Sequence, residues 1–146
     1  MRRVSLLVGA CAGGLLLAPA AEAATWRGKT NQGRSVTVRT GADGLVDHVL
    51  IRYEAGCSDG KGFRSRLTFR PPLDESSAAA FADGGVVMWR FTRTGERARG
   101  RASIGGGLRS SGRWTGNFRL RVKIRKGERV VAACRTGRVG WRASPA

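Results

Sequence analysis

The stretch that decides the fold runs from residue 114 to residue 125 and reads WTGNFRLRVKIR. From Phe118 onward, apolar residues alternate with polar or cationic ones, which is the period of two expected of a β-strand with one buried face. The apolar set is Trp114, Phe118, Leu120, Val122 and Ile124, and the opposite set is Thr115, Asn117, Arg119, Arg121, Lys123 and Arg125. The stretch therefore predicts a long strand with a cationic outer face.

Shorter segments with the same alternation lie on both sides of this stretch, separated by turns rich in Gly, Asn and Asp. We expect strands near residues 26–30, 35–40, 45–53, 63–70, 86–93, 97–104, 114–125, 129–134 and 139–143. Regular short strands joined by tight turns are typical of an all-β domain. The prediction is an antiparallel meander of about eight to ten strands, either small and barrel-like or a sandwich of two sheets.

Several shorter segments lead to predictions about local structure. The Ser and Ala content of residues 74–81 allows one short helical turn capped by Asp74. Residues 83–85 are expected to form a turn, and the glycines at 105–107 a flexible connector. In the strand at 45–53, strict alternation places Val49, Ile51 and Tyr53 on one face and Val46 on the other with His48.

The N-terminus has the composition of a signal peptide. A cationic head at Arg2 and Arg3 precedes an apolar run, and Ala21-Glu22-Ala23 suits cleavage. We therefore expect a signal peptide at residues 1–23, a single domain at residues 24–146, and a secreted or extracytoplasmic, envelope-associated protein. The alternatives are an uncleaved anchor, which would have to include Gly, Pro and Glu to span a bilayer, and lipidation at Cys11 in a lipobox-like sequence.

Two cysteines, Cys57 and Cys134, remain after cleavage. In an oxidising compartment, such a pair is expected to form a disulfide. The loop that it closes is long enough for a stabilisation of about 4 kcal/mol in the chain-entropy model. The chain has no CxxC motif and one histidine, so we expect no metal or other cofactor.

The formal charge of +17 is uneven along the chain. From residue 26 to residue 89, nine cationic residues face seven acidic ones, whereas from residue 90 to the end sixteen face two, Glu96 and Glu128. Only four of the 27 cationic residues are lysine. Arginine binds phosphate and carboxylate through a planar, bidentate group, so this composition favours an anionic partner.

Catalytic groups are sparse. His48 is the only histidine, and strict alternation would point its neighbour Asp47 to the opposite face of the strand. Ser58 and Asp59, beside Cys57, allow a nucleophile loop, although an Asp-Gly turn is the commoner explanation. The sequence therefore favours a non-enzymatic role and keeps an unrecognised hydrolase as an alternative.

A resemblance covers most of the domain. It rests on Trp26-x-Gly28-x-Thr30-x-Gln32-Gly33-Arg34, Cys57-Ser58-Asp59-Gly60, Trp114-x-Gly116-x-Phe118, and Cys134-Arg135-Thr136-Gly137-Arg138-Val139-x-Trp141. The succession resembles a loose group of small secreted β-domain proteins of GC-rich bacteria. The resemblance implies the β fold and the disulfide, and it carries over no functional residue.

Three cationic stripes are the functional signal. One comprises Arg64, Arg66 and Arg70, and the other two comprise the candidate binding residues Arg97, Arg99, Arg101, Arg119, Arg121, Lys123 and Arg125. We expect a non-enzymatic module that binds an anionic cell-envelope polymer or membrane surface, since alternate residues of a strand offer regularly spaced charges. A small-ligand carrier or inhibitor is the alternative. Trp89, Trp114 and Trp141 are in phase with core residues, so sequence-specific nucleic-acid binding is not expected.

Overall fold

The regular elements are β-strands that follow the alternation of apolar and polar side chains. The computed structural model describes residues 22–146, in which no residue is helical and no helix long and apolar enough to cross a membrane occurs. The all-β prediction is confirmed. The strands are β1 (Thr25–Thr30), β2 (Ser35–Thr40), β3 (Val46–Cys57), β4 (Gly62–Phe69), β5 (Glu75–Ser76), β6 (Ala80–Phe91), β7 (Glu96–Leu108), β8 (Trp114–Lys126), β9 (Arg129–Arg135) and β10 (Val139–Pro145).

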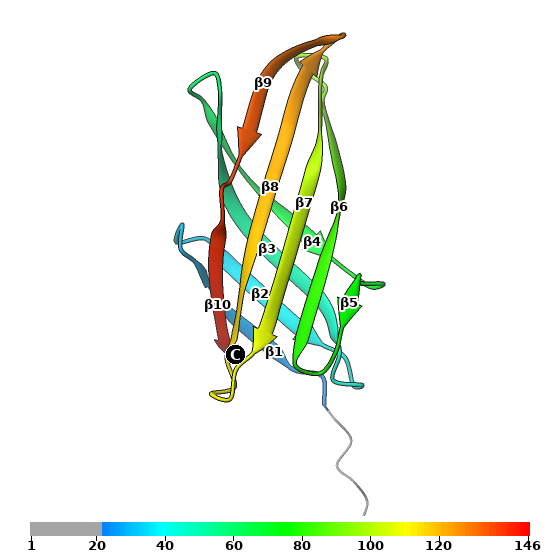
Figure 1. The fold of residues 1–146 in the computed structure, drawn as a ribbon, viewed down its shortest axis with the longest axis vertical. Coiled ribbons are helices and arrows are strands. Elements are labelled where there is room, and N and C mark those ends of the chain that lie inside the picture. The colour runs from blue at the N-terminus through cyan, green and yellow to red at the C-terminus, as the bar shows by residue number, and fades with distance from the viewer. Residues whose placement is uncertain (1–21) are drawn as a thin grey trace, which may run out of the picture.

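All ten strands belong to one antiparallel sheet in the order β10-β1-β2-β3-β9-β8-β7-β6-β5, with β4 on the free edge of β3 (Figure 1). One edge of β8 pairs first with β10 and then with β9. Because β10 also pairs with β1, and the end of β9 with the end of β3, the sheet bends back on itself at these two strands.

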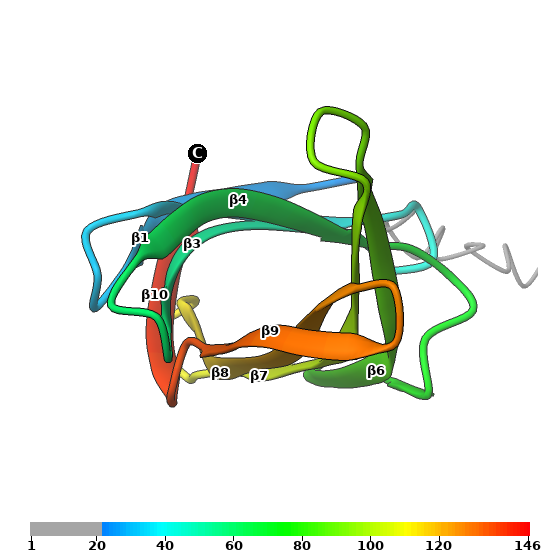
Figure 2. The ribbon, with the colours of Figure 1, turned by 90° about the horizontal axis from the view of Figure 1, so that it is seen from above.

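The bend produces two layers, which Figure 2 shows from above. We call β1 to β4 the N-terminal layer and β6 to β9 the C-terminal layer. No backbone pairing joins β4 to β6 among the described strands, so the sheet is open along that side. There the rings of Phe63 and Trp89 meet edge to face with centroids 6.4 Å apart. Side-chain packing therefore connects the layers where hydrogen bonding does not.

Aromatic side chains fill the interior between the layers. Tyr53 and Phe118 lie 5.0 Å apart, and Phe81 lies 5.5 Å from Trp114. As predicted, the four apolar residues of β8 from Trp114 to Val122 are buried. Phe91 is in phase with Val87 and Trp89 in the sequence, which predicts that it belongs to the same core. This prediction is wrong, since Phe91 is 42% exposed at the end of β6.

A β-bulge changes the faces of β3. Arg39 of β2 lies opposite His48, whereas Thr40 lies opposite Val46, so Asp47 is the extra residue. One extra residue reverses the alternation. Val46 is therefore buried together with Val49, and its predicted placement on the face opposite Val49 is wrong.

Residues 74–81 form no helix, contrary to our expectation. The amide of Ser77 donates to the carbonyl of Ala80, and the Ser77 hydroxyl accepts from the Ala80 amide, which closes the hairpin between β5 and β6. Serine competes for backbone bonds in this way, and a segment this short does not sustain a helix in water. The expected turn at residues 83–85 and the expected connector at residues 105–107 are instead paired parts of β6 and β7.

The predicted signal peptide and Cys11 fall outside the described residues, apart from Glu22 and Ala23 at their edge.

Candidate cationic binding face

The two candidate stripes are neighbours in the C-terminal layer. In the register of β7 and β8, Arg97 lies opposite Arg125, Arg99 opposite Lys123, and Arg101 opposite Arg121. Directly opposed residues of an antiparallel pair share one face, about 4.5–5.5 Å apart. All of these side chains are exposed. On β7 they alternate with Ala98 and Ala102, whose side chains are buried on the other face of the strand.

The face extends onto β9 through Arg135, which sequence reasoning missed. Arg135 is exposed and lies opposite Arg121, so Arg101, Arg121 and Arg135 form a row across three adjacent strands. The signal was hidden by a bulge, since Ile124 pairs with Ala132 but Arg125 pairs with Val130. We call the following eight residues the cationic face: Arg97, Arg99, Arg101, Arg119, Arg121, Lys123, Arg125 and Arg135.

The cationic face has no acidic partner among the described residues. The ion pairs found in residues 22–146 involve only Arg34, Arg39 and Arg64, which all belong to the N-terminal layer. Arg125 donates one hydrogen bond to the backbone carbonyl of Glu128. Like charges directly opposite one another on a sheet are destabilising, so this arrangement costs stability in the free protein.

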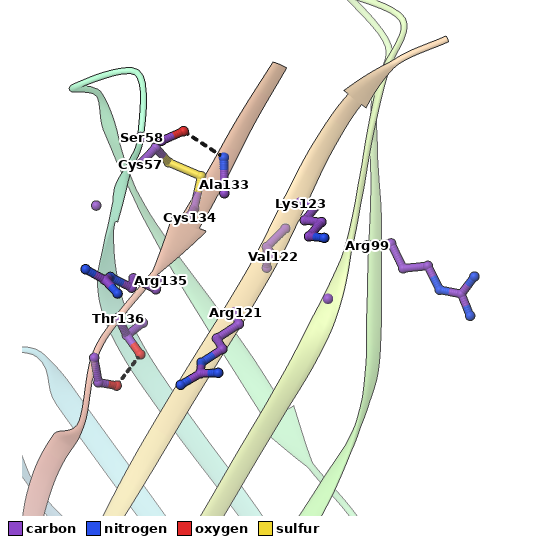
Figure 3. Close-up of a pocket in the computed structure, with 13 residues that line it drawn as sticks. Cys57, Ser58, Arg99, Arg121, Val122, Lys123, Ala133, Cys134, Arg135 and Thr136 are labelled. Carbon is purple, nitrogen blue, oxygen red and sulfur yellow. Dashed lines mark hydrogen bonds between the residues drawn. A yellow bond between two sulfur atoms is a disulfide. The ribbon is translucent and has the colours of Figure 1, made fainter. Parts of the chain in front are cut away.

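An open hollow of about 980 Å³ adjoins the face (Figure 3). Arg99, Arg121, Lys123 and Arg135 contribute to its lining, as do Cys57 and Cys134. Gly100 of β7 lies so close to β8 that a Cβ atom added to it would collide with the backbone carbonyl of Arg121. Glycine therefore lets β7 and β8 approach closely under the hollow.

The predicted disulfide is confirmed. Cys57 and Cys134 are bonded, with Cα atoms 4.0 Å apart, and they are directly opposed in the register of β3 and β9. Ser58 adds two hydrogen bonds: its amide donates to the Ala133 carbonyl at 2.9 Å, and its hydroxyl accepts from the Ala133 amide at 3.0 Å. These contacts fix the end of β3 against β9, and with it the side of the hollow that carries Arg135.

Comparison with protein-family models, with curated proteins and with solved structures found no match. The resemblance to small secreted β-domain proteins stays a prediction.

The third predicted stripe lies in the other layer and is partly neutralised. Arg64 and Arg34 both donate to the Glu54 carboxylate, at 3.1 and 2.8 Å. The hydrogen bond from Arg34, followed by that from Arg64, holds the pKa of Glu54 below its ordinary value. Arg66 is exposed opposite Arg52, and Arg70 follows the end of β4. Arg64, Arg66 and Arg70 therefore do not join the cationic face.

The candidate catalytic groups do not meet. Because of the bulge, Asp47 turns to Arg39, 3.7 Å away, on the side of the sheet that also carries His48. Desolvation, followed by the charges of Arg39 and Arg70, lowers the pKa of His48. Ser58 follows the end of β3, ten residues beyond His48, which corresponds to roughly 33 Å of extended chain. Its neighbour Asp59 accepts from the Lys61 amide in a turn. Within residues 22–146, no three His, Cys, Asp or Glu side chains group as a metal site would need.

Proposed function

We propose that this protein is a non-enzymatic, secreted or envelope-associated module that binds an anionic polymer along the cationic face. The observation that carries the proposal is the direct opposition of cations across β7, β8 and β9 without an acidic partner. An anion laid across these rows would offset their mutual repulsion.

The geometry suits a polymer with closely repeated charges. Neighbouring rows are separated by about 6.5–7 Å along a strand, and opposed residues by about 4.5–5.5 Å across it. Guanidinium groups grip phosphate and carboxylate oxygens in pairs. Teichoic acids, acidic polysaccharides and DNA held through its backbone all offer such groups. Trp114 and Trp141 cannot stack on bases, because both are buried in the core.

The disulfide is compatible with an extracytoplasmic location. The polymers named above also occur outside the cytoplasm. It also contributes to the site, since it holds β9 and Arg135 in place. Export, anionic-polymer binding and the covalent closure are therefore consistent parts of one proposal.

The test is a salt titration of binding to teichoic acid, an acidic polysaccharide and DNA. Neutralising about six charges should lower the affinity for duplex DNA about a thousandfold between roughly 0.05 and 0.2 M salt, because bound counterions are released. The variant R119Q/R121Q/R125Q should bind more weakly and reduce the slope of log affinity against log salt by about 2.7 on DNA.

A matched control removes the same charge from the other layer. The variant R52Q/R66Q/R70Q should keep most of the affinity, because these exposed residues lie outside the cationic face. Equal losses in the two variants would show that only net charge matters. If the unmodified protein binds none of the three polymers at about 0.05 M salt, where screening is still modest, the proposal is wrong.

A further inference from the structure

Exposed apolar side chains gather at one end of the molecule. Among residues 22–146, four of the six exposed large apolar residues lie toward this end: Met88 is 72% exposed, Phe91 and Val130 are each 42% exposed, and Val131 is 39% exposed. The other two are Val86, 49% exposed and farther from the turn on β6, and Leu45, 36% exposed. Met88 and Phe91 lie near the end of β6, and Val130 and Val131 lie at the start of β9. These residues come from two hairpins that are separated by more than 30 positions in the chain.

The strand register brings the two hairpins together. Arg90 lies opposite Arg97, Arg97 opposite Arg125, and Arg125 opposite Val130, so one row crosses β6, β7, β8 and β9 just below both turns. Both turns lie at the upper end of the molecule in Figure 1. The turn from β2 to β3, which carries Leu45, lies at the lower end of the same view.

The same end is cationic. Arg90, Arg93, Lys126 and Arg129 are exposed on it, beside two acids, Glu96 and Glu128. Glu96 accepts a hydrogen bond from the Thr94 hydroxyl and forms no ion pair within residues 22–146. We call these cations, together with Met88, Phe91, Val130 and Val131, the hairpin end. It combines apolar and cationic side chains at one end of the molecule.

We propose that the hairpin end docks on the surface of an anionic lipid bilayer. Apolar side chains next to basic ones are the combination that inserts at the boundary between headgroups and acyl chains. A second copy of the chain would cover the apolar residues but would bring two cationic rows together. An anionic bilayer covers the same residues and also supplies the opposite charge, so charge complementarity favours it. This interaction uses residues outside the cationic face and does not depend on polymer binding.

The test measures partition of the chain from Ala24 to Ala146, which carries all ten strands. The probes are vesicles of phosphatidylcholine alone and vesicles containing three parts in ten of phosphatidylglycerol. Strong partition is expected only with the anionic vesicles. The variant M88S/F91S/V131S should lower it about tenfold to a hundredfold, through lost apolar burial. The variant K126Q/R129Q should lower it about thirtyfold.

Leu45→Ser is the matched control, because Leu45 is 36% exposed and lies on another turn. Its partition should equal that of the unmodified protein. All variants should keep their unfolding midpoints, and M88S/F91S/V131S should keep its affinity for a soluble acidic polysaccharide. If the unmodified protein binds the anionic vesicles but no polysaccharide, only the proposed function is wrong. If it binds the polysaccharide but not the anionic vesicles, only this inference is wrong.

Two further results would overturn the inference. One is partition to anionic vesicles that M88S/F91S/V131S leaves unchanged, since binding would then be a matter of charge alone. The other is self-association without vesicles that the same variant abolishes, since the hairpin end would then bind a second copy. A tryptophan introduced by Phe91→Trp should gain quenching by brominated acyl chains over the unsubstituted protein in anionic vesicles only.

Discussion

The two layers of the sheet both carry arginine on their outer faces, yet they treat the charge differently. In the N-terminal layer, Glu54 lies between Arg34 and Arg64, and Asp47 turns to Arg39. In the C-terminal layer, the cationic face has no ion pair among the described residues. A stripe of arginine on a strand is therefore no binding site by itself, because acids on neighbouring strands decide whether its charge is available.

The strongest test of this comparison separates the layers at their covalent link. The variant C57S/C134S should lower the free energy of unfolding by about 4 kcal/mol, since it releases a loop with a sequence separation of 77 residues in the unfolded chain. Urea unfolding measures the change, and reduction of the unmodified protein should reproduce it. A loss close to zero would mean that core packing alone keeps the layers together.

A second test gives the C-terminal layer the acid that it lacks. Ser103 is exposed opposite Arg119, so Ser103→Glu places a carboxylate among the cations. Polyanion affinity at about 0.05 M salt should fall roughly tenfold, through loss of net charge at the face. The free energy of unfolding should rise by about 0.2–1 kcal/mol, as for other cross-strand pairs of opposite charge. Ser103→Gln is the control. If Ser103→Glu binds the polyanion as tightly as Ser103→Gln does, the comparison between the layers is wrong.

The converse test removes an acid from the N-terminal layer. Glu54→Gln frees Arg34 and Arg64, and affinity for an acidic polysaccharide should rise about twofold to fivefold, as for one added charge contact. On a sulfated polysaccharide, whose own charge does not change in this range, the same gain should appear in the unmodified protein on acidification, but only below pH 4.5, because the pKa of Glu54 lies below that ordinary value. Binding measured against pH checks both, and an unchanged variant would show that this layer takes no part even when unpaired.

The smallest expected effect concerns His48, which lies between the cations of the N-terminal layer. Its pKa is lowered, chiefly by desolvation and then by Arg39 and Arg70, so the unfolded chain binds a proton more readily than the folded one. Stability should therefore fall as pH drops below 6.5 and level off below the folded-state pKa. His48→Gln should flatten this part of the stability profile, and an unaltered slope would assign it to other groups.

The alternation of apolar and polar residues predicted the strands best where large side chains mark the two faces. Residues 114–125 were placed correctly because large apolar and cationic residues mark both faces. The glycines at 105–107 were taken for a connector because they have no side chains to show the period, although their backbone pairs with β8. In the same way, the small residues at 74–81 gave no apolar period from which a strand could be recognised.

The candidate site was predicted in part, for a related reason. The two long stripes were visible, but the membership of Arg135 and the neutralisation of Arg64 depend on strand neighbours and register. Bulges at Asp47 and beside Val130 insert single residues, and each reverses every face beyond it. No composition signal marks such an insertion, so alternation alone cannot place the residues that follow.

Because of the bulge in β9, formation of the disulfide depends on the register in which β9 pairs with β8. If β9 paired with β8 without the bulge, so that Val131 took a regular place opposite Ile124, Cys134 would lie opposite Arg121 and face solvent, and Arg135 would face the core. Cys134 could then no longer reach Cys57, so a chain in the wrong register would keep two free thiols. The register that permits the disulfide is also the one that presents Arg135. The disulfide would therefore form only in molecules whose strands, and with them the cationic face, are assembled in the native register.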